Sequence, residues 1–306
     1  MPDTDPHATG PTPSVPGRAV RVAALALLVV LGTATWAFAR WQQDPTPRDE
    51  VRVGRSTAEL TGSLPFHELL YKRTPAHLRI AQAQRRFVIA CMAGRGFRYE
   101  PPPIDTSPST EGYPAAFGLE SLTPPELAPG SPPRVQENRG EAFGRALLGD
   151  PGKRIRAHSG SITVTRPANG CQAESEQRLL GPDRTHWLQL RVQLGEGEKE
   201  IRRELETDPV FRTANARWRG CMAKRGFTES KDPVALLFRL PRGTDLSRTP
   251  VAVADIRCKS ETGYLLSAYT RLGALQRAWL DEHADTLRDW NALQKAQDEI
   301  ARASQR

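Results

Sequence analysis

Charged side chains are absent from Val22 to Ala39, and small or branched apolar residues fill most of these 18 positions. As an α-helix this stretch would be about 27 Å long, close to the thickness of the hydrocarbon core of a bilayer. Arg18 and Arg21 precede it and favour an inner location for the residues before it. The pattern therefore predicts a single-pass membrane segment at residues 22–39, with the remainder of the chain outside.

Two interpretations of this hydrophobic segment remain open. Ala37-Phe38-Ala39 has the small-x-small form of a signal-peptidase site, and cleavage at Ala39 would release a secreted protein. Trp36 and Trp41 would equally suit the interfacial belt of a retained anchor. We take the retained anchor in the cell membrane as the main prediction, and we expect residues 1–21 to form a disordered cytoplasmic tail.

Polar residues, prolines and glycines are frequent in residues 40–73, which predicts a linker between the membrane segment and the folded part. Helical periodicity begins at Thr74-Pro75, where a threonine N-cap precedes a proline in the first helical position. Apolar residues then recur at helical spacing until Gly94 and Gly96, which are placed to end the helix.

A proline-rich region separates this helix from the next one. Ten prolines lie between Tyr99 and Arg134, and they predict a long irregular loop. A short helix is predicted at 140–148, a brief strand at 161–165, and a polar helix that opens at Cys171. We expect residues 74–182 to form the first folded segment, which contains this loop.

The second folded segment, residues 183–306, is predicted to be largely helical. Helix starts of the same X-Pro form occur at Asp208-Pro209 and Thr249-Pro250, and the last helix is predicted to run almost to Gln305. Its heptad stripe favours a coiled coil with a partner helix, either residues 183–206 of the same chain or a second copy. The stripe consists of Leu265, Leu272, Trp279, Thr286, Leu293 and Ile300.

The most specific pattern is a duplication. Cys91–Phe97 and Cys221–Phe227 share six of seven residues in the form Cys-Met-Ala-x-Arg-Gly-Phe, and each copy ends a predicted helix. In each copy a loop follows, and a further cysteine, Cys171 or Cys258, then opens a polar helix. We expect the glycines to occupy turns, and the methionines and phenylalanines to pack around disulfides. These structural residues are Met92, Gly96, Phe97, Met222, Gly226 and Phe227.

The chain has four cysteines, which allow three disulfide pairings. If the two copies of the repeat form the same disulfide, the pairs are Cys91 with Cys171 and Cys221 with Cys258. The two loops, of about 80 and about 37 residues, would each stabilise the fold by roughly 4 kcal/mol through lost entropy of the unfolded chain. The two folded segments are therefore predicted to be disulfide-closed repeats.

This arrangement resembles a family of uncharacterised exported and lipoprotein-like proteins of high-GC Gram-positive bacteria. Its members carry Cys-Met followed by Gly-Phe, a Cys-led helix, Trp-x-x-Cys-Met, and Ala-x-Ala-Asp-x-x-Cys before a long terminal helix. Here the last two motifs are Trp218–Met222 and Ala252–Cys258. The resemblance covers about residues 75–300 and implies export, disulfides and a helical domain, but no activity. The chain departs from the lipoprotein-like members because no cysteine precedes Cys91.

The chain is basic, with a formal charge of +8. On an exported protein this charge favours anionic lipid headgroups, envelope proteins or anionic cell-wall polymer as partners, and not nucleic acid. The alternative is a solvated, salt-bridged surface, since arginine and glutamate alternate along most of the predicted helices. With 26 prolines and 24 glycines, part of the chain is predicted to lie outside any packed core.

No residue pattern predicts catalysis. His158-Ser159-Gly160-Ser161 places a histidine beside serines, but it lacks the context of a nucleophile elbow. Cysteines at least 37 residues apart do not form a zinc motif. Four further histidines are scattered without the spacing of metal ligands: His67, His77, His186 and His283. No catalytic, cofactor or metal site is therefore predicted, although paired carboxylates of a hydrolase need no fixed spacing in sequence.

The sequence thus predicts a mainly α protein with a membrane helix and an extracytoplasmic helical domain. This domain is expected to contain two disulfide-closed repeats, a long proline-rich loop and a long C-terminal helix. Its predicted role is that of a non-enzymatic binding or accessory component of the cell envelope, with self-association through the terminal helix as a further option. A cell-wall-modifying hydrolase and a membrane-anchored sensor are the alternatives.

Overall fold

The structure is a computed structural model that describes residues 57–104, 116–122, 140–240 and 245–305. These residues are mainly helical, as predicted, and they include one two-stranded sheet. Within these ranges, no helix combines the length and the apolar character that crossing a bilayer requires. The predicted membrane segment at residues 22–39 lies outside the described residues.

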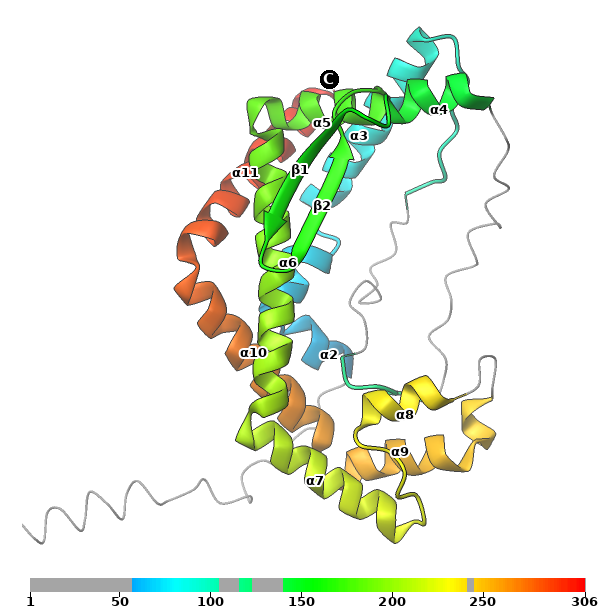
Figure 1. Cartoon of the computed structure of the whole chain (residues 1–306), viewed down its shortest axis with the longest axis vertical. Coiled ribbons are helices and arrows are strands. Elements are labelled where there is room, and N and C mark those ends of the chain that lie inside the picture. Colours follow the sequence, from blue (N-terminus) through cyan, green and yellow to red (C-terminus); the bar gives the residue numbers. More distant parts are fainter. Residues whose placement is uncertain (1–56, 105–115, 123–139, 241–244, 306) are drawn as a thin grey trace, which may run out of the picture. The chain divides into compact units, whose positions relative to one another are not determined.

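The described elements are helices, apart from the hairpin β1–β2 between α4 and α5 (Figure 1). They are α2 (Thr57–Gly62), the π-helix η1 (His67–Tyr71), α3 (Pro75–Gly94), α4 (Gly140–Leu148), β1 (Arg154–Ser159), β2 (Ile162–Pro167), α5 (Cys171–Leu180), the 3-10 helix η2 (Gly181–Asp183), α6 (Arg184–Thr207), α7 (Pro209–Lys224), α8 (Pro233–Arg239), the 3-10 helix η3 (Leu246–Arg248), α9 (Pro250–Glu261), α10 (Tyr264–Glu282) and α11 (Ala284–Ala303).

Packed structure begins earlier in the chain than Thr74. Helices α2 and η1 lie within the predicted linker, and Leu64 and Phe66 between them are buried. Phe66 packs edge-on against Trp279 of α10, with ring centroids 5.5 Å apart. The linker prediction is therefore wrong from residue 57 to residue 71. Proline and glycine divide the apolar residues of this stretch into groups too short to show a helical period.

Side-chain caps begin several helices, as the X-Pro pattern predicted. Thr74 accepts a hydrogen bond from the backbone N–H of His77 at 3.2 Å, and Asp208 accepts one from that of Phe211 at 3.0 Å. In both helices the proline follows the cap at the first helical position, where no backbone N–H is needed. Thr249 precedes α9 but does not cap it, because its hydroxyl donates to the carbonyl oxygen of Asp245.

The predicted long C-terminal helix is divided into α9, α10 and α11. Gly263 separates the first two with a φ of 62°, and His283 separates the last two with φ −114° and ψ 37°. The ring of His283 stacks on Trp279 at 3.8 Å between centroids and bonds to its carbonyl oxygen. After this break the stripe is less buried: Leu293 packs partly against the core, and Ile300 is 38% exposed.

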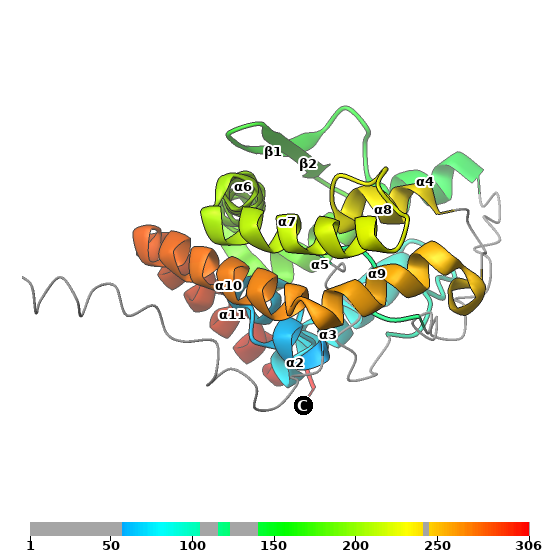
Figure 2. The ribbon, with the colours of Figure 1, turned by 90° about the horizontal axis from the view of Figure 1, so that it is seen from below.

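Helices α10 and α11 both contact α6, which is the packing within one chain that the stripe favoured. Figures 1 and 2 show α10 lying beside α6 and α7, and α11 lying beside α3. Asp298 of α11 receives two hydrogen bonds from Arg79 of α3, at 2.7 and 2.8 Å. Self-association through the terminal helices stays a prediction.

The predicted strand at 161–165 is β2, and its antiparallel partner β1 was not predicted. Ser159 pairs with Ile162 across the turn at Gly160, and the hairpin packs on α6. In β1 only Ala157 is buried, because Arg154, Arg156 and His158 point away from the core. In the sequence only Ile155 and Ala157 alternate with polar residues, and two apolar positions are too few to identify a strand.

The described residues form one compact unit. The predicted boundary at residue 182 falls in η2, and core residues from its two sides pack together: Leu179 and Leu180 of α5 contact Trp187 of α6 and Ala301 of α11. The largest core cluster joins α2, α6, α7, α9 and α10 with residues 116–122, a segment that we call the strap.

Candidate binding site

Both predicted disulfides are present. Cys91 is bonded to Cys171 and Cys221 to Cys258, and the Cα atoms are 5.6 Å apart in each pair. Glu174 lies beside the first disulfide, but both sulfur atoms there are already bonded to each other. This group of residues therefore gives no thiolate for a metal.

The two Cys-Met segments end their helices with the same backbone geometry. Gly96 and Gly226 have φ angles of 80° and 85°, a region that favours glycine. The N–H of Phe97 donates to the carbonyl oxygen of Met92 at 2.9 Å, and that of Phe227 donates to Met222 at 3.0 Å. These bonds are those of a Schellman cap, so the predicted role of both glycines as turn residues is confirmed.

The other predicted structural residues also occupy matching places. Met92 and Met222 are fully buried, and Phe97 and Phe227 are partly buried against neighbouring cores. Each copy adds an ion pair that was not predicted, between Arg95 and Glu174 and between Arg225 and Glu261. These features close a helix end and show no chemistry that would act on a ligand.

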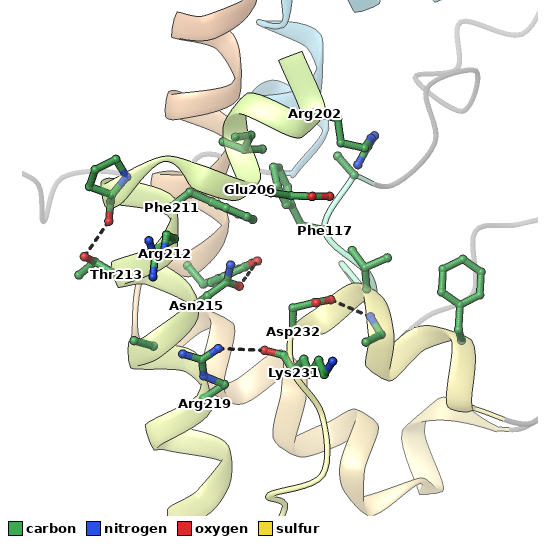
Figure 3. A pocket seen from close by; sticks show the side chains of 18 residues that line it. Phe117, Arg202, Glu206, Phe211, Arg212, Thr213, Asn215, Arg219, Lys231 and Asp232 are labelled. Atoms are coloured by element: carbon green, nitrogen blue, oxygen red, sulfur yellow. Dashed lines mark hydrogen bonds between the residues drawn. The ribbon is translucent and has the colours of Figure 1, made fainter. Parts of the chain in front are cut away.

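A cavity of about 1020 Å³ opens between the end of α6, α7, α8 and the strap (Figure 3). Such a volume lies at the upper end of the range for ligand sites. Its lining combines cations, carboxylates, amide and aromatic groups: Ala116, Phe117, Arg202, Leu205, Glu206, Pro209, Phe211, Arg212, Thr213, Asn215, Ala216, Arg219, Lys231, Asp232, Val234, Ala235, Phe238 and Tyr264. No sequence pattern predicted this site.

Cations outnumber carboxylates in the lining. Arg202, Arg212 and Lys231 are exposed, and none of them forms an ion pair with any residue that the structure describes. Arg219 donates to the carbonyl oxygen of Lys231 at 3.3 Å. Asp232 is engaged as the N-cap of α8, where it accepts from the N–H of Ala235 at 2.8 Å. The lining therefore has four cations against two carboxylates and is net positive, with Arg202 also in the electrostatic field of Glu198.

Aromatic rings form the inner wall and the rim. Phe117 of the strap packs against Phe211 of α7, with centroids 5.6 Å apart, and Phe211 lies 6.2 Å from Tyr264 of α10. The hydroxyl of Tyr264 donates to Asn215 at 3.0 Å. By contrast, Phe238 at the mouth is 83% exposed. Its exposed ring is available for contact with the carbon skeleton of a ligand.

The strap makes one wall of the cavity and is held tightly from behind. Gly118 has a φ of 79°, and a Cβ atom there would collide with the carbonyl of Pro233 in α8. The ammonium group of Lys259 donates to the carbonyl oxygen of Leu119, and Tyr269 donates to Glu120. The wall that carries Phe117 is therefore a fixed part of the second disulfide region.

A buried charged pair supports this wall. Asp255 is 0% exposed and Lys259 2% exposed. Their carboxylate and ammonium groups lie 2.8 Å apart, and the indole N–H of Trp218 donates to Asp255 at 2.9 Å. Burial raises the pKa of Asp255 and lowers that of Lys259, while their mutual attraction opposes both changes. Neither residue lines the cavity, so their role is to position it.

Trp218 and Asp255 belong to the two motifs of the family resemblance, Trp-x-x-Cys-Met and Ala-x-Ala-Asp-x-x-Cys. The motifs therefore contained the signal for this cluster, but they did not reveal that the two side chains meet. The sequence gives a weaker indication of the cavity. Arg212 and Arg219 are seven residues apart on one predicted helix and therefore lie on the same face of it.

The weak catalytic pattern at residues 158–161 is not assembled into a triad. His158 bonds to Thr163 across the hairpin at 3.0 Å, whereas Ser161 donates to Glu196 of α6 at 3.1 Å. The four scattered histidines stay on separate parts of the structure: His67 in η1, His77 in α3, His186 in α6 and His283 between α10 and α11.

The cavity, with its unpaired cations and aromatic walls, is thus the described site best suited to a ligand. No family model, no curated protein and no solved structure matches this chain.

Proposed function

We propose that this protein is a non-enzymatic binding component of the cell envelope, and that its cavity takes an anionic ligand. The observation that carries the proposal is the large cavity with three exposed cations, Arg202, Arg212 and Lys231, that lack ion-pair partners among the described residues. A site that is rich in uncompensated positive charge attracts anions and raises their association rate.

The envelope location is supported by the two disulfides, since such bonds persist mainly in oxidising compartments. The predicted membrane segment at 22–39 and the resemblance to exported proteins are consistent with the same location. In an envelope, anionic lipid headgroups and anionic wall polymers are the abundant ligands of this charge.

Binding is favoured over hydrolysis by the positions of the carboxyl groups. Glu120 and Glu198 have a pKa raised by burial, as a general acid requires, but neither lines the cavity. Of the two carboxylates that do line it, Asp232 caps α8 and Glu206 is exposed. The described cavity thus lacks a buried acid pair of the kind that a wall hydrolase uses.

The test is calorimetric titration of the full chain, held in an uncharged detergent, with long synthetic poly(glycerol phosphate). Uncharged polyglycerol is the ligand control. Binding is expected for the anionic polymer alone and should weaken as salt is added, because the contacts are exposed and screened.

Two triple variants separate the cavity from general surface charge. The pocket variant carries Arg202→Gln, Arg212→Gln and Lys231→Gln, and it should weaken binding by roughly ten-fold or more if each exposed ion pair contributes about 0.5–1 kcal/mol.

The matched control carries Arg217→Gln, Lys224→Gln and Arg277→Gln, three exposed cations that do not line the cavity. It has the same net charge as the pocket variant and should bind like the unchanged protein. Equal weakening by both variants, or no binding of the polymer at all, would contradict the proposal.

A further inference from the structure

We infer that the ligand is a linear chain with repeated anionic groups and hydroxyl groups between them, and not a single small anion. This inference rests on the proposed anion-binding function of the cavity and specifies the shape and chemistry of its ligand. Three features of the lining support it: the spread of the cations, their exposure, and the groups that lie between them.

The cations are spread along the cavity. Arg212 and Arg219 lie seven residues apart on α7, which places them on the same face and about 10 Å apart along the helix axis. The hydrogen bond to Lys231 holds Arg219 at one end of the site, whereas Arg202 of α6 lies at the other end (Figure 3). One phosphate or carboxylate group cannot contact both ends, but successive groups of a chain can.

The cations are also exposed, and none is buried against a neutral wall. A site for one small anion usually surrounds it with several desolvated donors, because an exposed ion pair contributes little by itself. Here Arg202, Arg212, Arg219 and Lys231 are all exposed. Useful affinity then requires several weak contacts on one molecule, which a repeating chain supplies through its high effective concentration.

Hydrogen-bonding groups lie between the cations. Glu206 follows Arg202 by one helical turn, and Asn215 lies between Arg212 and Arg219. The oxygen of Asn215 accepts from Tyr264, so its amide N–H groups are directed to other acceptors. A carboxylate repels a continuous run of anions but accepts hydrogen bonds from hydroxyl groups. The exposed ring of Phe238 in the lining can contact the carbon skeleton of such a chain.

The experiment is a length series with the full chain in uncharged detergent: glycerol phosphate, and its phosphodiester-linked dimer, trimer and hexamer, compared at equal phosphate concentration. The hexamer is expected to bind roughly ten-fold or more tightly per phosphate than the monomer. The dependence of the dissociation constant on salt should steepen with length, because longer chains make more charge contacts.

A single-residue variant tests whether the length dependence of binding arises in the cavity. Arg202→Gln should weaken hexamer binding by about two- to five-fold and monomer binding by clearly less, since a single phosphate can use another cation. Arg217→Gln is the matched control on α7 outside the cavity and should change neither.

Two further ligands test the chemistry of the chain. Inorganic polyphosphate of matched charge has no hydroxyl groups, so it should bind more weakly than the glycerol phosphate hexamer. Tighter or equal binding of polyphosphate would overturn the hydroxyl part of the inference. Oligogalacturonate distinguishes the sources: length-dependent binding of it as well means that charge spacing is recognised, whereas its failure beside the phosphate hexamer assigns phosphodiesters.

The two levels of proposal fail differently. If monomer and hexamer bind equally well per phosphate and the pocket variant abolishes both, the cavity binds anions but the inferred chain is wrong. If no phosphate ligand of any length binds, the proposed function itself is wrong.

Discussion

The two Cys-Met segments have the same helix cap and disulfide but different interiors. Three residues before the cysteine, the first copy has Val88 and the second has Trp218. Three residues before the second cysteine, Ala168 of the first copy corresponds to Asp255, and one residue after it Gln172 corresponds to Lys259. The second copy thus contains a buried polar cluster at positions where the first copy has none of the three groups.

This difference distinguishes the residues of the repeated segment that end its helix from those that position the cavity. The first copy packs apolar and aromatic residues around its disulfide, with Phe97 edge-on to Phe143 at 5.6 Å. The second copy uses Lys259 to hold the strap, and the strap carries Phe117 into the cavity. We therefore assign a structural role to the shared residues and a site-positioning role to the residues in which the copies differ.

Removal of either disulfide should be among the most destabilising changes, with a similar loss of stability in each copy. For loops of 80 and 37 residues, the paired substitutions Cys91→Ala/Cys171→Ala and Cys221→Ala/Cys258→Ala should each lower the free energy of unfolding by about 4 kcal/mol. Urea unfolding of the full chain, followed by circular dichroism, measures this. A loss in only one copy would show that the two disulfides are not equivalent supports.

Substitution of Lys259 should separate the copies most clearly. Lys259→Met leaves the carboxylate of Asp255 buried without its cation, and we expect a loss of about 3–5 kcal/mol in the free energy of unfolding. Gln172→Met is the matched change in the first copy. Because Gln172 is partly exposed, it should lower the free energy of unfolding by less than about 0.5 kcal/mol.

The double variant Asp255→Asn/Lys259→Met should recover part of the loss, since no charge then remains buried. If Lys259→Met costs no more than Gln172→Met in urea unfolding, the buried pair does not hold the strap.

The capping glycines should respond equally. Gly96→Ala and Gly226→Ala each force an L side chain into positive φ, although no atom lies close enough to collide with it. A loss of about 1 kcal/mol is expected for each, from backbone conformation alone. Thermal unfolding of the two variants checks this, and a difference of more than about 1 kcal/mol between them would mean that the surroundings of the caps contribute.

The smallest expected effect is a loss of stability in acid, which should be similar in the two copies. In each copy an Arg–Asp pair connects the first helix to the C-terminal helices. Hydrogen bonds from Arg79 lower the pKa of Asp298 below 3.8. Burial raises the pKa of Asp208, but bonds from the Phe211 N–H and from Arg271 together lower it below 3.8. Each pair therefore contributes stability above about pH 4, which is lost as the pH falls through the lower pKa of the folded state.

Asp298→Asn and Asp208→Asn test this with urea unfolding between pH 2 and pH 6. Each variant should be less stable than the unchanged protein near pH 6, and the difference should shrink towards pH 2. A constant difference across this range would show that the carboxylate charge is not the stabilising feature.

Most helices could be predicted because their signals are local. Thr74 and Asp208 cap the helices that they precede, and Gly96 and Gly226 end them, through hydrogen bonds between residues no more than five positions apart. The missed elements were those whose burial depends on distant residues. Phe66 is buried because Trp279 covers it, and β1 is ordered because β2 and α6 lie beside it.

The sequence by itself determined the mainly helical fold and the caps at Thr74 and Asp208, because their signals are local. It also determined the pairing of the four cysteines, because the repeated motif shows which cysteines of the two copies are equivalent. Only the tertiary structure decided the breaks at Gly263 and His283 and the position of the cavity. The cavity brings Phe117 of the strap to residues 202–238, and Lys259 to Leu119. These contacts join residues 85 to 140 positions apart, and local periodicity does not indicate which distant side chain will lie in a given space.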